Sequence, residues 1–252
     1  MLIFIIGSGN VATHLAQGFA VAQHKIAGVC SSTIEHARQL AQKFDTTAYT
    51  DIKTIPANAD FYIISISDDN IKNVVAEMPD VNGIVAHTAG SIDVGVLQRF
   101  DNYGVIYPMQ SFSKNREINL AEVPFFVEGN NRATTEKLLQ LASTLSDEVR
   151  ELSSAERKML HLSAVFSSNF VNEMFAEAEI ILKQCNLPFD LLKPLIYETV
   201  AKALEMKPMQ AQTGPARRND VGVMQMQQNL LANENLRKLY SFASQRIVER
   251  YK

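Results

Sequence analysis

The sequence predicts an α/β fold in which a doubly wound, mostly parallel sheet is followed by an all-α C-terminal domain. From Leu2 to about Arg150, short apolar runs alternate with amphipathic stretches, as they do in βα units on a parallel sheet. After Glu151, helix-compatible sequence follows with few interruptions. At 252 residues the chain also exceeds the usual size of one domain. We therefore expect two domains, residues 1–151 and 152–252.

Seven strands are expected in the first domain. They lie near residues 2–6, 26–30, 61–66, 83–87, 104–107, 124–128 and 148–151. Helices should occupy the intervals between strands, including residues 11–22 and 34–44. Ser32 and Glu35 have the spacing of a capping box at the start of the second of these helices.

One long helix should open the second domain. Ser153 and Glu156 form another capping-box candidate, and neither Gly nor Pro follows before Cys185, which corresponds to roughly 45 Å of helix. Further helices are expected near residues 189–206, 221–231 and 235–252, with 207–220 as a long irregular segment. The long helix carries more apolar surface than a small domain can cover alone, which predicts a homodimer.

Composition excludes several classes of partner. The formal net charge is -3 and the chain has no long basic run, so we expect no nucleic-acid partner. The apolar opening stops at Gly7, which indicates a strand rather than a signal peptide, and no apolar stretch approaches the roughly 20 residues of a membrane helix. Cys30 and Cys185 stand in no metal or redox spacing, so we expect no metal site and a reduced, cytoplasmic setting.

A glycine-rich turn follows the first strand. Gly7-x-Gly9-x-x-Ala12 lies between an apolar strand and a helix, which is the context of a dinucleotide-binding Rossmann unit. The first glycine permits a tight turn, the second lets the backbone approach a pyrophosphate, and the helix N-terminus offers free N–H groups. The residues of this turn expected to hold the cofactor are Gly7, Ser8, Gly9, Asn10 and Val11.

The end of the second strand favours NADP over NAD as the cofactor. NAD-binding folds usually place Asp or Glu there, roughly 20 residues after the glycines. This chain has Ser31, Ser32 and Thr33 instead, whose hydroxyls beside a helix N-terminus can receive a 2′-phosphate, with Arg38 as a further candidate. N-capping of the helix by Ser32 is compatible with that role.

Several motifs resemble a family of bacterial Rossmann-like proteins with a helical C-terminal domain of unassigned function. The family belongs with pyrroline-5-carboxylate reductases, deazaflavin-dependent NADP reductases and hydroxyacid dehydrogenases. The resemblance covers the whole chain and rests on the glycine turn and on residues 63–69, 87–91, 161–169 and 213–220. It implies a Rossmann fold and a nicotinamide cofactor, with Ser65, Ile66 and Ser67 near it. Where the family shows Arg-Gly-Asp, this chain has Arg218-Asn219-Asp220, and Asn is the next best residue for a left-handed backbone.

The long helix carries three candidate catalytic residues. His161 is a candidate because histidine side chains can donate a proton near neutral pH as hydride arrives, although a packed histidine bonded to a backbone carbonyl is equally compatible. Lys158 and Asn169 lie three turns apart on nearly the same face. Lys158 can also be a solvated charge, and Asn169 a polar helix contact. The related hydroxyacid dehydrogenases place a Lys and an Asn four residues apart, a spacing that this chain does not reproduce.

Two loops add further candidates. Thr88 and Ser91 follow a sheet strand, where doubly wound folds bind ligands, while His87 is interpreted as a packed strand-end residue. Tyr107 and Ser111 can add a wall after the next strand. In the segment 213–220, Arg218 can bind an anionic group of substrate or cofactor with Asp220 orienting its guanidinium; a surface Arg–Asp pair is the alternative.

Two functions fit these residues. The first is an NADP-dependent oxidoreductase that transfers hydride between nicotinamide and a small carbonyl, alcohol or imine substrate in the cleft between the domains. The second is a dinucleotide-binding sensor or assembly protein without turnover, since Rossmann folds serve both purposes. The discriminating observation is whether His161 and Asn169 face the cofactor pocket or are buried in a helix contact.

Overall fold

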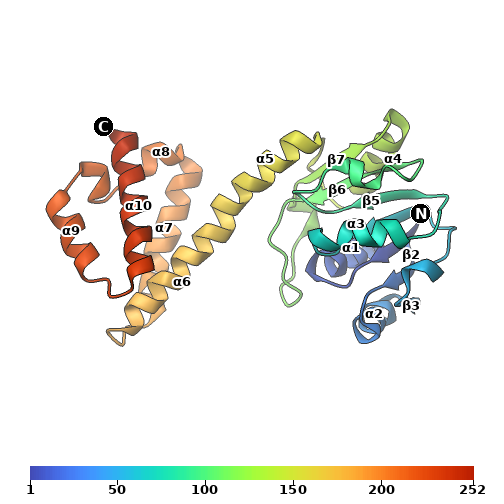
Figure 1. The fold of residues 1–252 in the computed structure, drawn as a ribbon, viewed down its shortest axis with the longest axis horizontal. Coiled ribbons are helices and arrows are strands. Elements are labelled where there is room, and N and C mark those ends of the chain that lie inside the picture. The colour runs from blue at the N-terminus through green and yellow to red at the C-terminus, as the bar shows by residue number, and fades with distance from the viewer. The chain divides into compact units, whose positions relative to one another are not determined.

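The computed structural model describes all 252 residues and contains two compact units, Met1–Asn169 and Phe170–Lys252 (Figure 1). The first unit is a sheet with helices on both faces, and the second is entirely helical. The first unit extends past residue 151, because α5 (Ser154–Ala164) belongs to it.

The eight strands of the first unit form one sheet in the order β3-β2-β1-β4-β5-β6-β7-β8. Neighbouring strands are parallel except β6 and β7, which confirms the doubly wound, mostly parallel prediction. Their bounds are β1 Leu2–Ile6, β2 Lys25–Cys30, β3 Thr47–Tyr49, β4 Phe61–Ile64, β5 Ile84–His87, β6 Tyr103–Pro108, β7 Phe125–Gly129 and β8 Val149–Glu151. Sequence reasoning missed β3, whose three residues are too few to show alternation.

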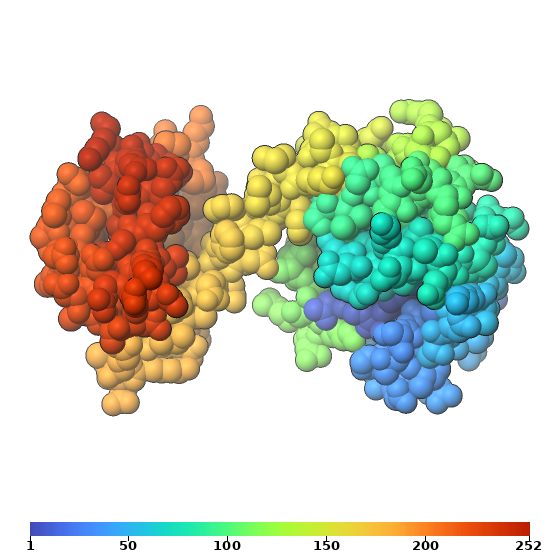
Figure 2. Space-filling view, viewed as in Figure 1, coloured from blue at the N-terminus to red at the C-terminus, as the bar shows by residue number.

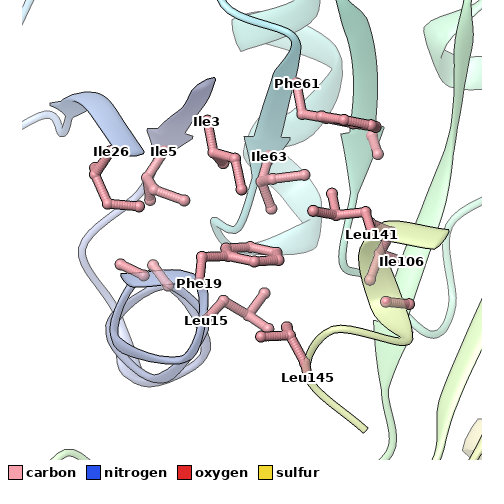
Figure 3. Packing of buried hydrophobic residues seen from close by; sticks show 14 of the residues in the cluster. Ile3, Ile5, Leu15, Phe19, Ile26, Phe61, Ile63, Ile106, Leu141 and Leu145 are labelled. Carbon is pink, nitrogen blue, oxygen red and sulfur yellow. The ribbon is translucent and has the colours of Figure 1, made fainter. Parts of the chain in front are cut away.

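Alternation along the strands divides the core into two layers. Ile3 and Ile5 of β1 pack with α1 (Asn10–Val21), as Figure 3 shows for Leu15 and Phe19, and with α4 (Arg132–Ala142). On the other face, Phe4 and Ile6 pack with α3 (Asp68–Glu77). Successive side chains of a strand point to opposite faces, so a continuously apolar strand is needed to bury both.

The two predicted capping boxes have different outcomes. At α5 the Ser153 side chain accepts the Glu156 N–H, and the Glu156 carboxylate accepts the Ser153 N–H, which confirms the prediction. At α2 (Ile34–Ala41) the prediction is wrong, because the N-cap is Thr33 and no side chain caps the helix. Since the helix begins one residue later than the capping box requires, Glu35 occupies its second position rather than its third.

The expected long helix is interrupted rather than regular throughout. A π-helical turn, Val165–Asn169, separates α5 from α6 (Phe170–Lys183), and the boundary between the two units falls at its end. The polar run Ser167-Ser168-Asn169 lies in this turn, where i→i+5 bonding adds a residue to the helix.

The second unit has little core of its own. Its other helices are α7 (Lys193–Glu205), α8 (Pro208–Ala211), α9 (Val221–Asn229) and α10 (Glu234–Tyr251). Side chains of α9 and α10 form much of its viewed face in Figure 2. Only Ala216 and Leu231 are buried in this unit. The segment 207–220, expected to be irregular, contains α8 and a short 3-10 turn, Ala216–Arg218.

Candidate active site

A pocket of about 800 Å³ opens where the carboxyl ends of β1, β2, β4 and β5 meet. All residues that line it belong to the first unit. Every residue expected from the sequence to bind the cofactor is among them, namely Gly7, Ser8, Gly9, Asn10, Val11, Ser31, Ser32, Ser65, Ile66, Ser67 and Thr88. This is the edge at which doubly wound folds bind ligands.

The glycine turn is built for close approach of a ligand to the backbone. Gly7 has φ +122°, and a Cβ there would lie 2.0 Å from the Ser65 carbonyl oxygen, so only glycine fits. Gly9 differs, because a Cβ built on it meets no atom within 4 Å. Gly9 is the N-cap of α1 and no side chain caps that helix, which leaves its first N–H groups available to an anion. These features fit a dinucleotide pyrophosphate.

Hydroxyls and a carboxylate surround the end of β2. Ser31 Oγ is 2.8 Å from Ser8 Oγ, and Ser32 and Asp51 also line the pocket. No Lys or Arg lines it. Arg38, the cation considered for a 2′-phosphate, is exposed on α2 and lies outside the lining. Serine hydroxyls and the uncapped N-terminus of α2 are therefore the groups that can receive a phosphate here.

The turn after β5 is fixed by hydrogen bonds. The Thr88 hydroxyl donates to Ser65 Oγ (3.2 Å), and the Ala89 N–H donates to His87 Nδ1 (3.2 Å). His87 is fully buried, and burial together with the nearby Arg157 charge lowers its pKa to about 3. His87 is therefore neutral at physiological pH and supports the turn, whereas Thr88 faces the pocket.

His161 of α5 faces this pocket and is bonded to a tyrosine. Its Nδ1 lies 3.0 Å from the Tyr107 hydroxyl, and the two rings meet edge to face at 81°. Burial raises the pKa of Tyr107, with the Arg157 charge opposing the rise, so the phenol keeps its proton at neutral pH. The ring packs against Gly90, where a Cβ would lie 2.6 Å from His161 Nδ1. Both His161 and Tyr107 line the pocket.

Because Nδ1 is engaged by Tyr107, Nε2 is the nitrogen of His161 that can exchange a proton with a bound molecule. The phenol fixes the orientation of the imidazole, as the second partner of a catalytic histidine commonly does. Sequence reasoning considered Tyr107 only as a wall. It lies 54 residues before His161, so no local pattern could pair them.

The other candidates on the long helix lie elsewhere. Lys158 does not line the pocket, and its ammonium pairs with Asp93 at 3.2 Å on the surface. Asn169 is exposed in the π-helical turn and is also absent from the lining. Of His161 and Asn169, whose positions were to distinguish an oxidoreductase from a sensor, only His161 faces the pocket.

Arg218 and Asp220 lie in the second unit and do not form the expected pair. The Asp220 carboxylate accepts the Val223 N–H and caps α9, and no ion pair joins it to Arg218. Arg217 stacks on the Tyr251 ring instead. Asn219 adopts the left-handed conformation with φ 55°, so the expected turn is present. Their role toward a substrate stays a prediction.

Two kinds of feature are absent from the structure. No helix is both long and apolar enough to cross a membrane. No group of three or more His, Cys, Asp or Glu side chains is arranged to hold a metal ion.

Comparisons with known proteins identify the family. Residues 1–110 match a family model described as a Rossmann-like domain, and residues 123–247 match a domain of unknown function, DUF2520. A crystal structure from Bacteroides fragilis, provisionally named an NADP oxidoreductase, is 41% identical with a TM-score of 0.91 over 98% of each chain. The chain belongs to this family of Rossmann-like proteins with a DUF2520 domain. No curated protein matches its sequence.

More distant structures share the fold of this DUF2520 protein. The 1-pyrroline-5-carboxylate reductase of Streptococcus pyogenes is 16% identical with a TM-score of 0.65, over 100% of this chain and 98% of the reductase. A reductive aminase from Aspergillus terreus, crystallised with NADPH and ethyl-5-oxohexanoate, is 16% identical with a TM-score of 0.71, over 98% of this chain and 93% of the aminase. The resemblance drawn from the sequence motifs is thus confirmed.

Proposed function

We propose that the protein is an NADP-dependent oxidoreductase acting on a small carbonyl, alcohol or imine. The observation that carries the proposal is the placement of the Tyr107–His161 pair on the wall of the pocket that the glycine turn also lines. The name of the Bacteroides fragilis protein and the NADPH bound to the reductive aminase agree with this function and cofactor.

Different residues bind the cofactor and transfer the proton. The glycine turn and the N-terminus of α1 hold the pyrophosphate, and Thr88 and Gly90 border the space between that turn and His161. A bound nicotinamide supplies the hydride. With both ring nitrogens protonated, His161 donates the Nε2 proton to the substrate oxygen or nitrogen. The neutral ring that remains keeps its Nδ1 proton bonded to the Tyr107 hydroxyl, which holds the ring in place.

A sensor or assembly protein without turnover is the alternative. It would need the glycine turn but no proton donor beside the nicotinamide end of the pocket. The test is a screen of ketones, keto acids, imines and hydroxy acids with NADPH or NADP⁺, followed by absorbance at the nicotinamide band. Tight NADPH binding with no oxidation by any substrate class would favour the sensor.

We predict that NADPH binds more tightly than NADH. No carboxylate directly follows β2, and Ser31 and Ser32 stand beside the uncapped N-terminus of α2, where hydroxyl and N–H donors can hold a 2′-phosphate. Fluorescence titration of both reduced cofactors measures the difference in affinity, and Ser32→Ala should make the affinities for NADPH and NADH more similar. Asp51 lines the same region, and its negative charge works against a phosphate. Equal or reversed affinities would mean that the charge of Asp51 outweighs the hydroxyls.

We also propose that the second unit forms a homodimer. It buries only Ala216 and Leu231, while large apolar side chains on every long helix stay exposed, including Met174, Ile181, Leu195, Val200, Leu204, Met226 and Phe242. A second copy of the chain that packs on these helices would bury such side chains, as an interface does. Light scattering at micromolar concentration should give about twice the 28.1 kDa of one chain. A mass of one chain at that concentration would refute the dimer.

A further inference from the structure

One face of α5 is polar where it meets the sheet. Ser154, Arg157, Lys158 and His161 lie at positions i, i+3, i+4 and i+7, which share one side of a helix. Each has a partner elsewhere in the first unit, and all these partners are polar. The helix is therefore attached to the sheet by directional bonds rather than by apolar packing alone. Such bonds specify both the rotation of α5 about its axis and its position along that axis.

Arg157 is the centre of this attachment. Its side chain is 1% exposed, although arginine is almost never fully buried unless paired. Its Nη1 forms an ion pair with Glu128 of β7, and its Nη2 donates to the Ile92 carbonyl at 2.5 Å and to Ser154 Oγ at 3.1 Å. Ser154 Oγ donates in turn to the same Glu128 carboxylate at 2.6 Å.

Such a pair is costly to bury and cannot be explained by stability alone. Removing two charges from water costs several kcal/mol per ion, and well-packed apolar residues can often replace a buried pair without loss. The fork of the guanidinium, however, bonds a strand residue and a loop carbonyl at once, which a single ammonium cannot reproduce. Its three contacts, with Glu128, the Ile92 carbonyl and Ser154, fix one geometry of α5 on the sheet.

That geometry determines where His161 lies. His161 follows Arg157 by four residues, about 6 Å along the helix at 1.5 Å per residue. The ring must fit between the Tyr107 hydroxyl and Gly90, where little free space exists. A rotation or slide of α5 would separate His161 Nδ1 from Tyr107. The exposed Lys158–Asp93 pair, with side chains 44% and 59% exposed, can contribute little to this restraint.

We propose that Arg157 is a positioning residue that, with Glu128, holds α5 so that His161 meets Tyr107 at the pocket wall. The consequence of this positioning for catalysis rests on the proposed function. The positioning of His161 by Arg157 does not depend on that function. Arg157 touches no residue of the glycine turn, so its effect on cofactor binding should be small. A 1 Å displacement of a catalytic group can lower turnover by about 10²-fold.

The test is the state of the His161 imidazole, measured by long-range ¹H–¹⁵N NMR at pH 8 without cofactor or substrate. We expect the Tyr107 bond to hold His161 of the parent in one tautomer, which gives two well-separated nitrogen signals. Tyr107→Phe provides the reference for a released ring. We expect Arg157→Lys to shift both signals toward the averaged positions of that reference, and Lys158→Ala, the control on the same face, to leave them unchanged. Circular dichroism checks that each variant is folded.

Glu128→Gln keeps the size of the side chain and a hydrogen-bond acceptor but removes its negative charge. This variant replaces Arg157→Lys in the test if Arg157→Lys does not fold. Parent-like His161 signals in a folded Arg157→Lys or Glu128→Gln variant would overturn the proposal. So would an equal shift in Lys158→Ala. Because the readout uses neither NADPH nor turnover, a failure of cofactor binding would refute the proposed function and leave this result intact.

Discussion

His161→Gln is expected to lower turnover by about 10² to 10⁴-fold on whichever substrate the screen finds, which is the usual contribution of a positioned proton donor. The affinity for NADPH should stay within about twofold, because the groups proposed to bind its phosphates lie on the glycine turn and at the end of β2, not on α5. Glutamine keeps a hydrogen-bonding side chain but cannot supply a proton at neutral pH. Steady-state kinetics and NADPH titration on the same preparation separate the two effects.

Two control variants make this result specific. His36→Gln replaces an exposed histidine on α2 that does not line the pocket and should change nothing. Tyr107→Phe removes the partner of Nδ1 but keeps the ring that packs beside His161, so its loss of turnover should be smaller than that of His161→Gln. Unchanged turnover in His161→Gln would assign the histidine a structural role and favour the sensor.

Gly9→Ala is expected to weaken NADPH binding by about 10²-fold or more, about 2.7 kcal/mol, while leaving the fold intact. A Cβ at Gly9 meets no atom within 4 Å and the backbone there is extended, with φ -74°, so alanine is compatible with the protein itself. The methyl group would instead fill the space through which the backbone approaches the pyrophosphate. The expected loss of NADPH affinity thus arises only if the cofactor lies against the backbone at Gly9.

Gly7→Ala and Gly222→Ala are the matched comparisons. Alanine at Gly7 would place its Cβ 2.0 Å from the Ser65 carbonyl oxygen at φ +122°, so it should lower the thermal stability as well as the affinity. At Gly222 in α9 a Cβ would meet only Asp220 Oδ1, at an ordinary contact distance of 4.0 Å, and the residue lies outside the pocket, so alanine there should keep both the stability and the affinity. NADPH affinity in Gly9→Ala equal to the parent's would contradict binding at this turn.

Much of the first unit could be predicted because its signals are local. β1 is followed directly by Gly7 and Gly9, and a continuously apolar strand before a helix indicates a parallel sheet buried on both faces. β3 was missed because three residues, Thr47–Tyr49, do not display a period. At α2 the spacing of Ser32 and Glu35 fitted a capping box, but the start of the helix decides capping, and it lies one residue further on.

Only one residue of the proposed catalytic pair could be predicted from the sequence. His161 stood out on its helix, whereas Tyr107 is brought to it by the docking of α5 beside β6, a tertiary contact with no sequence pattern. Arg157 was not considered at all, since an arginine on an amphipathic helix is normally a solvated charge. The expected ion pair between Arg218 and Asp220 does not form, and the Asp220 carboxylate instead caps α9.

We propose that NADP lies along the glycine turn with its nicotinamide beside His161. A crystal structure of the chain grown with NADP⁺ tests it most directly. We expect the pyrophosphate over Gly9 and the N-terminus of α1, and the nicotinamide between the Thr88–Gly90 turn and the His161 ring, with Tyr107 still bonded to Nδ1. A nicotinamide placed away from His161, or an empty pocket at millimolar NADP⁺, would contradict the account.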